Sequence, residues 1–122
     1  MNNDIQDITN EDINLGKLIL QILKSDVVIL MSWGFNSPIV IKMGLRFKVN
    51  GFKLKNGTIS IKYNGGSDLF DLTFNNQDGT VRNTLEGIYF DELGSVIDDQ
   101  VEMIENYNER VSQLYNFLSN EE

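Results

Sequence analysis

The sequence predicts an α+β fold: an antiparallel β-meander of four to six strands, strongly curved, with an N-terminal helix and a long C-terminal helix. Apolar residues recur at helical spacing near both ends of the chain, and they alternate with polar residues in its middle. A chain of 122 residues has room for one hydrophobic core. We therefore expect a single domain over residues 1–122, made of the following parts: a flexible N-terminus (1–9), a helix (10–25), a β-sheet region (27–85) and a second helix (91–118).

The first helix is predicted from apolar residues spaced three and four apart after Thr9, a typical N-cap with Asp12 three residues further on. Gly16 weakens this helix by about 1 kcal/mol relative to alanine. The next segment, Val27–Trp33, is a nearly continuous apolar run rich in β-branched residues, which favours a strand buried on both faces. Its length leaves a second interpretation open, in which the helix continues to Met31.

Short alternating segments predict the other strands. Pro38 is expected to open a short strand over Ile39–Ile41. Asn50-Gly51 and Asn56-Gly57 then separate alternating segments, and such pairs are the strongest short-range signal for hairpins because both turn residues adopt positive φ. Two more turns are expected at Gly65-Gly66 and Asp78-Gly79.

Charge is sorted along the chain. Residues 27–67 contain six basic residues and no acidic one, whereas residues 68–122 contain thirteen acidic and two basic residues. If both Asn-Gly pairs form two-residue turns, Val49 faces Phe52 and Lys48 faces Lys53, so apolar side chains line one face of the sheet and bases the other. The predicted binding surface consists of Arg46, Lys48, Lys53, Lys55 and Lys62.

Three environments can compensate these neighbouring positive charges: solvent, an acidic protein surface, and a phosphate backbone. The net charge of −8 opposes long-range attraction to nucleic acid. In the predicted register the aromatic side chains point to the core, away from the bases, whereas single-stranded nucleic acid needs aromatic stacking. A nucleic-acid-binding module is thus the alternative function, and a protein partner or a homo-oligomer is favoured.

Trp33 and Phe35 flank a glycine in the most unusual local segment. They form either an exposed aromatic patch, which would add both residues to the binding surface, or one closed end of the core at Trp33.

The second helix is predicted from Asp91, a good N-cap, to about Leu118, a length of about 40 Å at about 1.5 Å per residue. Such a helix would overhang a small sheet. Its distal half is therefore expected to pack on a second copy or to fold back, with these interface residues: Tyr107, Val111, Leu114 and Leu118.

The composition excludes several kinds of chemistry. With no cysteine and no histidine, the chain lacks disulfides, thiolate nucleophiles, and the commonest general base and metal ligand. Asp98, Asp99 and Glu102 could bind Mg²⁺ or Ca²⁺, but a solvated helix face is favoured. We predict a non-enzymatic protein without catalytic residues, metal or cofactor. The third option, an enzyme, would use carboxylate, Tyr, Ser or Lys side chains alone.

One pair of carboxylates has two interpretations. Asp68 and Asp71 could serve acid–base chemistry. More simply, Asp71 falls on the basic face beside Lys62 as a cross-strand charge partner.

Three short motifs, Met31–Phe35, Asp68–Asp71 and Gly87–Leu93, resemble those of small proteins of Bacteroides-type gut bacteria, their phages and conjugative elements. The likeness covers about residues 31–102. That group has no assigned activity, so the resemblance implies a phage or mobile-element setting and no site residue.

The cellular location is predicted from two features. The N-terminus lacks the basic region of a signal peptide. The longest apolar run, Val27–Met31, is far shorter than the about 20 residues that span a bilayer. We therefore expect a cytoplasmic protein without a membrane partner.

Overall fold

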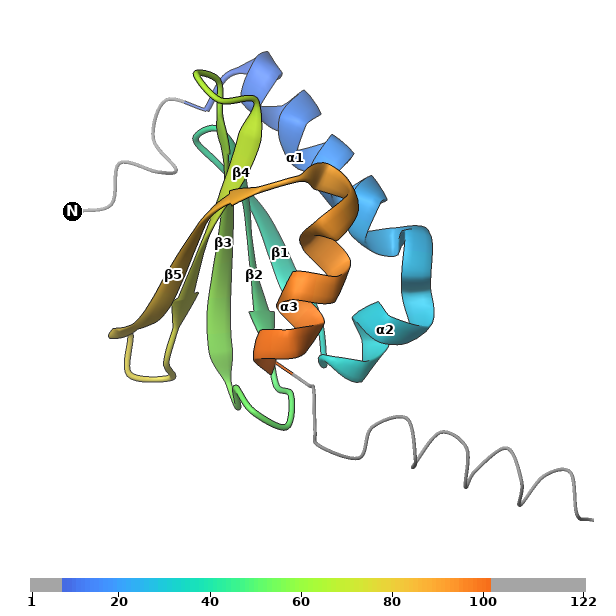
Figure 1. Cartoon of the computed structure of the whole chain (residues 1–122), viewed down its shortest axis with the longest axis vertical. Helices are drawn as coiled ribbons and strands as arrows, with labels where there is room; N and C mark the ends of the chain where they lie inside the picture. Colours follow the sequence, from blue (N-terminus) through green and yellow to red (C-terminus); the bar gives the residue numbers. More distant parts are fainter. Residues whose placement is uncertain (1–7, 102–122) are drawn as a thin grey trace, which may run out of the picture.

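The computed structural model describes residues 8–101 (Figure 1). Its elements in chain order are α1 (Asn10–Leu23), the 3₁₀ turn η1 (Lys24–Asp26), α2 (Val27–Ser32), β1 (Asn36–Ile41), β2 (Gly44–Val49), β3 (Gly57–Asn64), β4 (Leu69–Asn75), β5 (Val81–Ile88), the 3₁₀ turn η2 (Phe90–Glu92) and α3 (Leu93–Val101).

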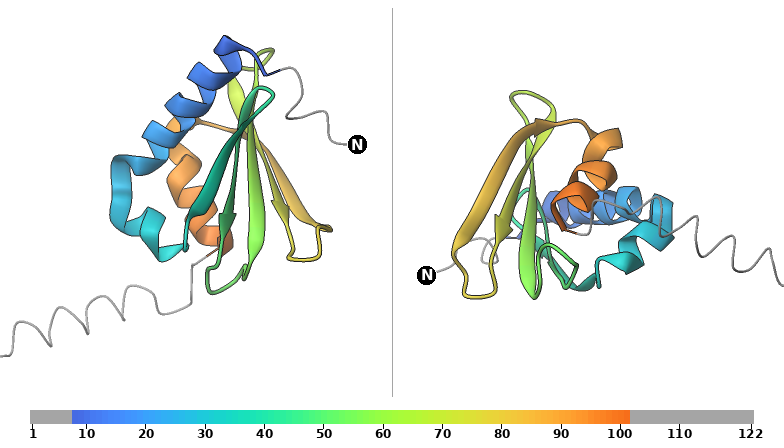
Figure 2. Two further views of the ribbon diagram at one scale, coloured as in Figure 1. Left: turned by 180° about the vertical axis from the view of Figure 1, so that it is seen from behind. Right: turned by 60° about the horizontal axis from the view of Figure 1, so that its bottom comes forward.

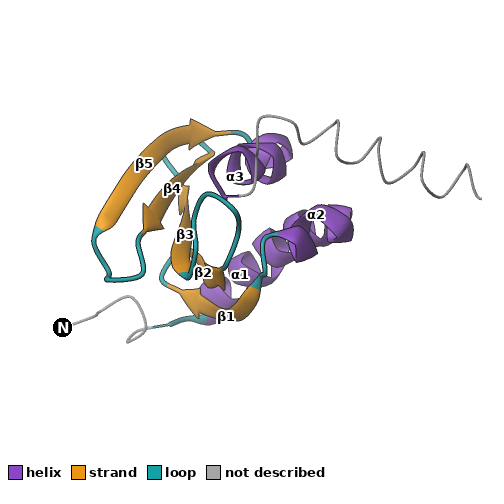
Figure 3. Ribbon diagram, turned by 90° about the horizontal axis from the view of Figure 1, so that it is seen from below, coloured by secondary structure: helices purple, strands orange, loops and turns teal. Residues whose placement is uncertain are grey.

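The five strands form one antiparallel sheet in the order β1-β2-β3-β4-β5, so the predicted α+β meander is confirmed. Figures 1 and 2 show α1, α2 and α3 on the same side of this sheet. Within the described residues no helix covers the other side, which we call the open face (Figure 3). The sheet is twisted and open; the prediction of a strongly curved sheet is wrong.

The core lies between the sheet and the helices. Alternate strand residues point toward the helices because successive side chains of a strand point to opposite faces. The largest fully buried side chains come from both layers: Trp33, Phe47, Phe74, Ile19, Ile41, Leu54, Ile59, Ile61, Leu72, Leu93, Ile97 and Val49.

The predicted first helix is confirmed, and its cap is the one expected. Thr9 Oγ1 accepts a hydrogen bond from the Asp12 backbone N–H at 3.2 Å, and Asp12 Oδ2 accepts one from the Thr9 N–H at 3.0 Å. A Cβ atom on Gly16 would lie 2.9 Å from Val40 Cγ2. The helix-weakening glycine therefore lets α1 approach β1 closely.

The predicted strand Val27–Trp33 is wrong, and the alternative of a continuing helix is close to the structure. After the 3₁₀ turn η1 the chain resumes an α-helix, α2, with Leu30 as its buried residue. Val28 and Met31 are 71% and 72% exposed. An apolar run of this length is compatible with either a buried strand or a short helix. In the structure β1 is the edge strand of the sheet, and the segment before it forms the helix α2 instead of a further strand.

The predicted hairpins at Asn50-Gly51 and Asn56-Gly57 are also wrong, because no strand lies between these two pairs. Strand β2 pairs with β3, so that Val49 lies opposite Gly57 and residues 50–56 form a loop. Phe52, which was expected in the core, is 61% exposed, while Leu54 is buried.

Tertiary contacts hold this loop in place. The Asn50 N–H donates to Trp33 O at 2.6 Å. The N–H groups of Lys53 and Leu54 donate to Val101 O at 2.6 and 3.3 Å. The loop thereby contacts the carbonyl of Val101, the last residue of α3 that the structure describes.

The later part of the meander agrees with the prediction. Lys62 lies opposite Asp71, as the cross-strand interpretation requires. A short loop containing Gly79, with φ of 92°, connects β4 to β5.

The C-terminal helix begins at Leu93, after η2, rather than at Asp91, and α3 is described for nine residues. Residues 102–118 of the predicted long helix lie outside the described part of the chain. The predicted interface there is therefore not described: Tyr107, Val111, Leu114 and Leu118.

Candidate functional site on the open face of the sheet

Three of the predicted basic residues lie together on the open face. Arg46 and Lys48 alternate with buried residues of β2, and Lys62 follows buried Ile61 in β3. Arg46 lies opposite Ser60, and Lys48 lies opposite Thr58. We call Arg46, Lys48 and Lys62 the basic triad.

The other two predicted lysines do not belong to this face. Lys53 and Lys55 lie in the loop 50–56 because the first predicted hairpin is absent. The Lys53 ammonium group donates to the Asp99 backbone O at 3.1 Å, which places Lys53 beside α3. The predicted surface of five bases is thus reduced to the basic triad.

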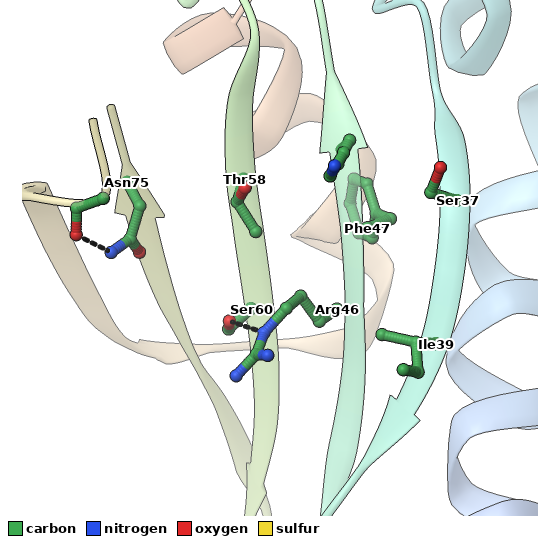
Figure 4. Close-up of a pocket in the computed structure, with 9 residues that line it drawn as sticks. Ser37, Ile39, Arg46, Phe47, Thr58, Ser60 and Asn75 are labelled. Carbon is green, nitrogen blue, oxygen red and sulfur yellow. Dashed lines mark hydrogen bonds between the residues drawn. The ribbon is translucent and has the colours of Figure 1, made fainter. Parts of the chain in front are cut away.

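A hollow of about 510 Å³ lies over β1, β2, β3 and β4, and two members of the triad, Arg46 and Lys48, line it (Figure 4). Arg46 and Lys48 line it together with hydroxyl groups of Ser37, Thr58 and Ser60. The Arg46 Nε–H donates to Ser60 Oγ at 3.4 Å, a bond that holds the guanidinium against the sheet (Figure 4). A second hollow of about 390 Å³ shares Lys48 and Thr58 with the first.

The lining of the two hollows favours an anionic or strongly hydrogen-bonding ligand. Arginine, lysine and hydroxyl side chains all donate hydrogen bonds, and charge-assisted bonds to carboxylates are the stronger kind. The second hollow adds amide side chains, which both donate and accept: Asn36, Asn56 and Gln77. Residues 27–67 contribute no acidic side chain to this face, whereas Asp71 of β4 lies opposite Lys62.

Trp33 does not belong to an exposed aromatic patch. Its side chain is 1% exposed, and its indole Nε1–H donates to Asp98 Oδ1 at 3.0 Å. Phe35 is half-buried, and its ring packs on that of Phe47 with centroids 4.7 Å apart. The interpretation of Trp33 as a closed end of the core is confirmed, so the exposed patch that required Trp33 is absent; the contact role of Phe35 stays a prediction.

The carboxylates of Asp68 and Asp71 have separate partners. Asp71 Oδ1 accepts a hydrogen bond from the Gly87 N–H at 3.1 Å, and Asp68 accepts one from the Tyr63 hydroxyl. The bond to Asp68 raises the pKa of the Tyr63 phenol above its usual value. The two carboxylates thus serve different contacts instead of forming one acid–base pair.

Carboxylate side chains are spread over residues 8–101. Within this range no group of three or more carboxylates is arranged to hold a metal ion. Asp98 accepts the hydrogen bond of Trp33, which gives one member of the predicted acidic cluster a structural role; Glu102 lies outside the described range.

Sequence reasoning did not identify the hydroxyl groups that line the first hollow. Thr58 and Ser60 alternate with buried residues in β3, and this pattern places them on the face of the triad. The register with β2 was required to bring them next to Arg46 and Lys48, and the false Asn50-Gly51 turn gave a different register.

Comparison of the chain with models of known families, with curated proteins and with solved structures found no match. The resemblance to proteins of Bacteroides-type bacteria and their phages stays a prediction. Among the described residues, no helix combines the length and the apolar composition needed to cross a bilayer.

Proposed function

We propose that this protein is a non-enzymatic binding module, an accessory protein of a phage or mobile element, whose open sheet face binds an acidic segment of another protein. The observation that carries the proposal is that Arg46 and Lys48 line adjoining hollows on a sheet face that no described helix covers.

An acidic polypeptide fits the chemistry of this face. Arg46 and Lys48 offer charged donors two residues apart on one strand, a spacing that matches alternate side chains of an extended segment. Hydroxyl groups of Thr58 and Ser60 add neutral donors, and the hollows give room for side chains of the partner. Electrostatic complementarity of this kind supplies specificity and fast association.

A nucleic acid fits less well. Non-specific single-strand binding combines basic side chains with aromatic stacking platforms. The aromatic residues of β2 and β4 are all buried toward the helices: Phe47, Phe70 and Phe74. The net charge of −8 also opposes attraction to a phosphate backbone.

The proposal is tested with a fluorescently labelled short poly-glutamate peptide and fluorescence anisotropy at low salt. The double variant Arg46→Glu, Lys48→Glu should bind the peptide at least about tenfold more weakly, a change of about 1.4 kcal/mol. The matched control is Lys53→Glu, Lys55→Glu, which changes the net charge equally but lies in the loop 50–56. Its affinity should fall by less than about threefold.

The outcomes separate the two functions. Equal weakening by both double variants would mean that only overall charge matters, and the open face would lose its role. A labelled single-stranded poly-dT that binds more tightly than the peptide, with the same dependence on Arg46 and Lys48, would favour the nucleic-acid alternative. If the unmodified protein binds neither probe at low salt, both functions of this face are refuted.

A further inference from the structure

An apolar groove runs along the helical side of the molecule, away from the open face. Three hollows of about 460, 460 and 380 Å³ follow one another between α1–α2 and η2–α3. The first and second share Ile22 and Phe90, and the second and third share Ile29 and Ser95. The shared residues show that the hollows form one continuous groove, and Figure 1 shows the helices that flank it.

Large apolar side chains in this groove are exposed to solvent. Phe90 is 61% exposed and Leu18 is 49% exposed, and both line it. Leu15, Ile22 and Ile29 add further apolar lining. A continuous apolar groove on a folded domain is typical of a docking surface for another segment.

The charges beside the groove restrict its occupant. The titratable side chains that line it are acidic, apart from the phenol of Tyr63: Asp68, Asp91, Asp98 and Asp99. An acidic occupant would be repelled, whereas an uncharged apolar segment would not.

One segment of this chain has the required composition. Residues 111–120 contain no charged residue, although glutamates precede and follow them in the sequence. Val111, Leu114, Tyr115 and Leu118 follow the spacing i, i+3, i+4, i+7 of a helix with one apolar face. This is the pattern by which an amphipathic helix binds a hydrophobic groove.

The connection to this segment has a suitable length and starting point. The described chain ends at Val101, and Asp98 and Asp99, just before it, line one end of the groove. Residues 102–110 can span up to about 30 Å when extended. That reach allows the chain to reverse direction and place residues 111–120 along the groove.

We propose that residues 111–120 of this chain dock as an amphipathic helix in the groove between α1–α2 and η2–α3, with Val111, Leu114, Tyr115 and Leu118 facing Phe90 and its neighbours. Because this segment is covalently attached to α3, its effective concentration at the groove exceeds that of a segment from a separate molecule. An isolated ten-residue helix is marginal in water, so stable helical structure there requires the groove.

The test is hydrogen–deuterium exchange of the full chain, read for the amides of residues 111–120. We expect exchange at least about tenfold slower than the rate of an unstructured peptide, because docked amides open rarely. The tail variant Leu114→Asp, Leu118→Asp and the groove variant Phe90→Ser should each abolish this protection.

Two matched controls keep the test specific. The control for the tail variant is Ser112→Asp, Asn116→Asp, which adds the same charge to the polar side of the segment. The control for Phe90→Ser is Phe52→Ser, which changes a phenylalanine of equal exposure, 61%, in the loop 50–56. Both should keep the protection. Leu18→Ser serves as a second groove variant if Phe90→Ser fails to fold by circular dichroism.

Each remaining outcome overturns the proposal. Unprotected amides over residues 111–120 in the unmodified chain would show that the groove does not hold them. Protection that appears only with rising protein concentration, together with a dimer mass in light scattering, would assign the groove to the segment of a second copy. Protection that persists in all groove variants would mean that the segment is ordered elsewhere.

Discussion

The hydrogen bond from the Trp33 indole to Asp98 allows a sharp test of the packing between α2 and α3. Trp33 is the only tryptophan in the chain and is 1% exposed, and its Nε1 lies 3.0 Å from Asp98 Oδ1. Replacing Asp98 by alanine removes the acceptor and leaves the indole N–H without it. Replacing it by asparagine keeps a side-chain oxygen at the same position.

The expected size of the effect follows from the burial of the indole. A buried donor that loses its partner costs about 1–3 kcal/mol. Asp98 itself is only half-buried and lines the end of the groove, so water can replace part of the lost bond. We therefore expect Asp98→Ala to lower the free energy of unfolding by about 1–2 kcal/mol, a Tm decrease of about 4–8 °C for a domain of this size.

Thermal unfolding followed by the fluorescence of Trp33 measures this change directly. The control is Asp99→Ala, which removes the neighbouring exposed carboxylate and should shift the Tm by less than about 2 °C. Asp98→Asn should recover more than half of the stability lost in Asp98→Ala. If Asp98→Ala and Asp99→Ala have the same Tm, the indole bond contributes nothing and the assigned structural role of Asp98 is wrong.

Two further predictions concern the β1–β2 turn and the start of α1. A Cβ atom on Gly44 would lie 1.8 Å from Ile61 O, so Gly44→Ala should lower the free energy of unfolding in urea by at least about 3 kcal/mol. The control is Gly94→Ala, where the added Cβ meets nothing within 4 Å and the variant should be neutral or stabilising. Equal stability of both variants would contradict the register of β2 and β3. Backbone N–H groups of Thr9 and Met43 lower the pKa of Asp12 below its usual value of 3.8, so this carboxylate stabilises the fold above about pH 4 and loses that effect as the pH falls through its lowered pKa. The urea midpoint should therefore fall less between pH 5 and pH 3 in Asp12→Asn than in the unmodified protein, and an unchanged acid dependence in the variant would refute this role.

Local sequence patterns predicted the elements in which short-range contacts and burial in the fold favour the same structure. The capping box at Thr9 and Asp12 fixes the start of α1 by contacts only three residues apart. The alternation in β3 and β4 places Lys62 opposite Asp71 because each strand has one buried face. In these cases the sequence itself contains the interactions that decide the structure.

The path of the loop 50–56 is decided by distant contacts. Asn50-Gly51 has the preferred residues of a tight turn, yet the Asn50 N–H donates to Trp33 O. The N–H groups of Lys53 and Leu54 donate to Val101 O in α3. A short-range preference of this kind is small compared with burial of Leu54 and two backbone bonds to α3. None of these partners lies near residue 50 in the sequence, so no local pattern could reveal them.

The sequence predicted the residues of the candidate site only where it also predicted the strand that carries them. Arg46, Lys48 and Lys62 are placed correctly because each alternates with buried neighbours in its own strand. Lys53 and Lys55 were misplaced because their position depended on the false turn. The groove on the helical side had no sequence signal at Phe90 and Leu18, since helical spacing does not tell a buried apolar residue from an exposed one.

The two proposed surfaces lie on opposite sides of the sheet, and this separation makes a joint test possible. Reversing the charge of Arg46 and Lys48 should weaken peptide binding without changing hydrogen exchange in residues 111–120, and Phe90→Ser should do the converse. The chain contains an acidic stretch, Glu102 to Glu109, between the end of α3 and the docking segment, and this stretch is itself a candidate competitor for the basic triad. If Arg46→Glu, Lys48→Glu also removes the protection of residues 111–120, the tail lies across the open face, and the acidic ligand of the triad is a segment of the same chain.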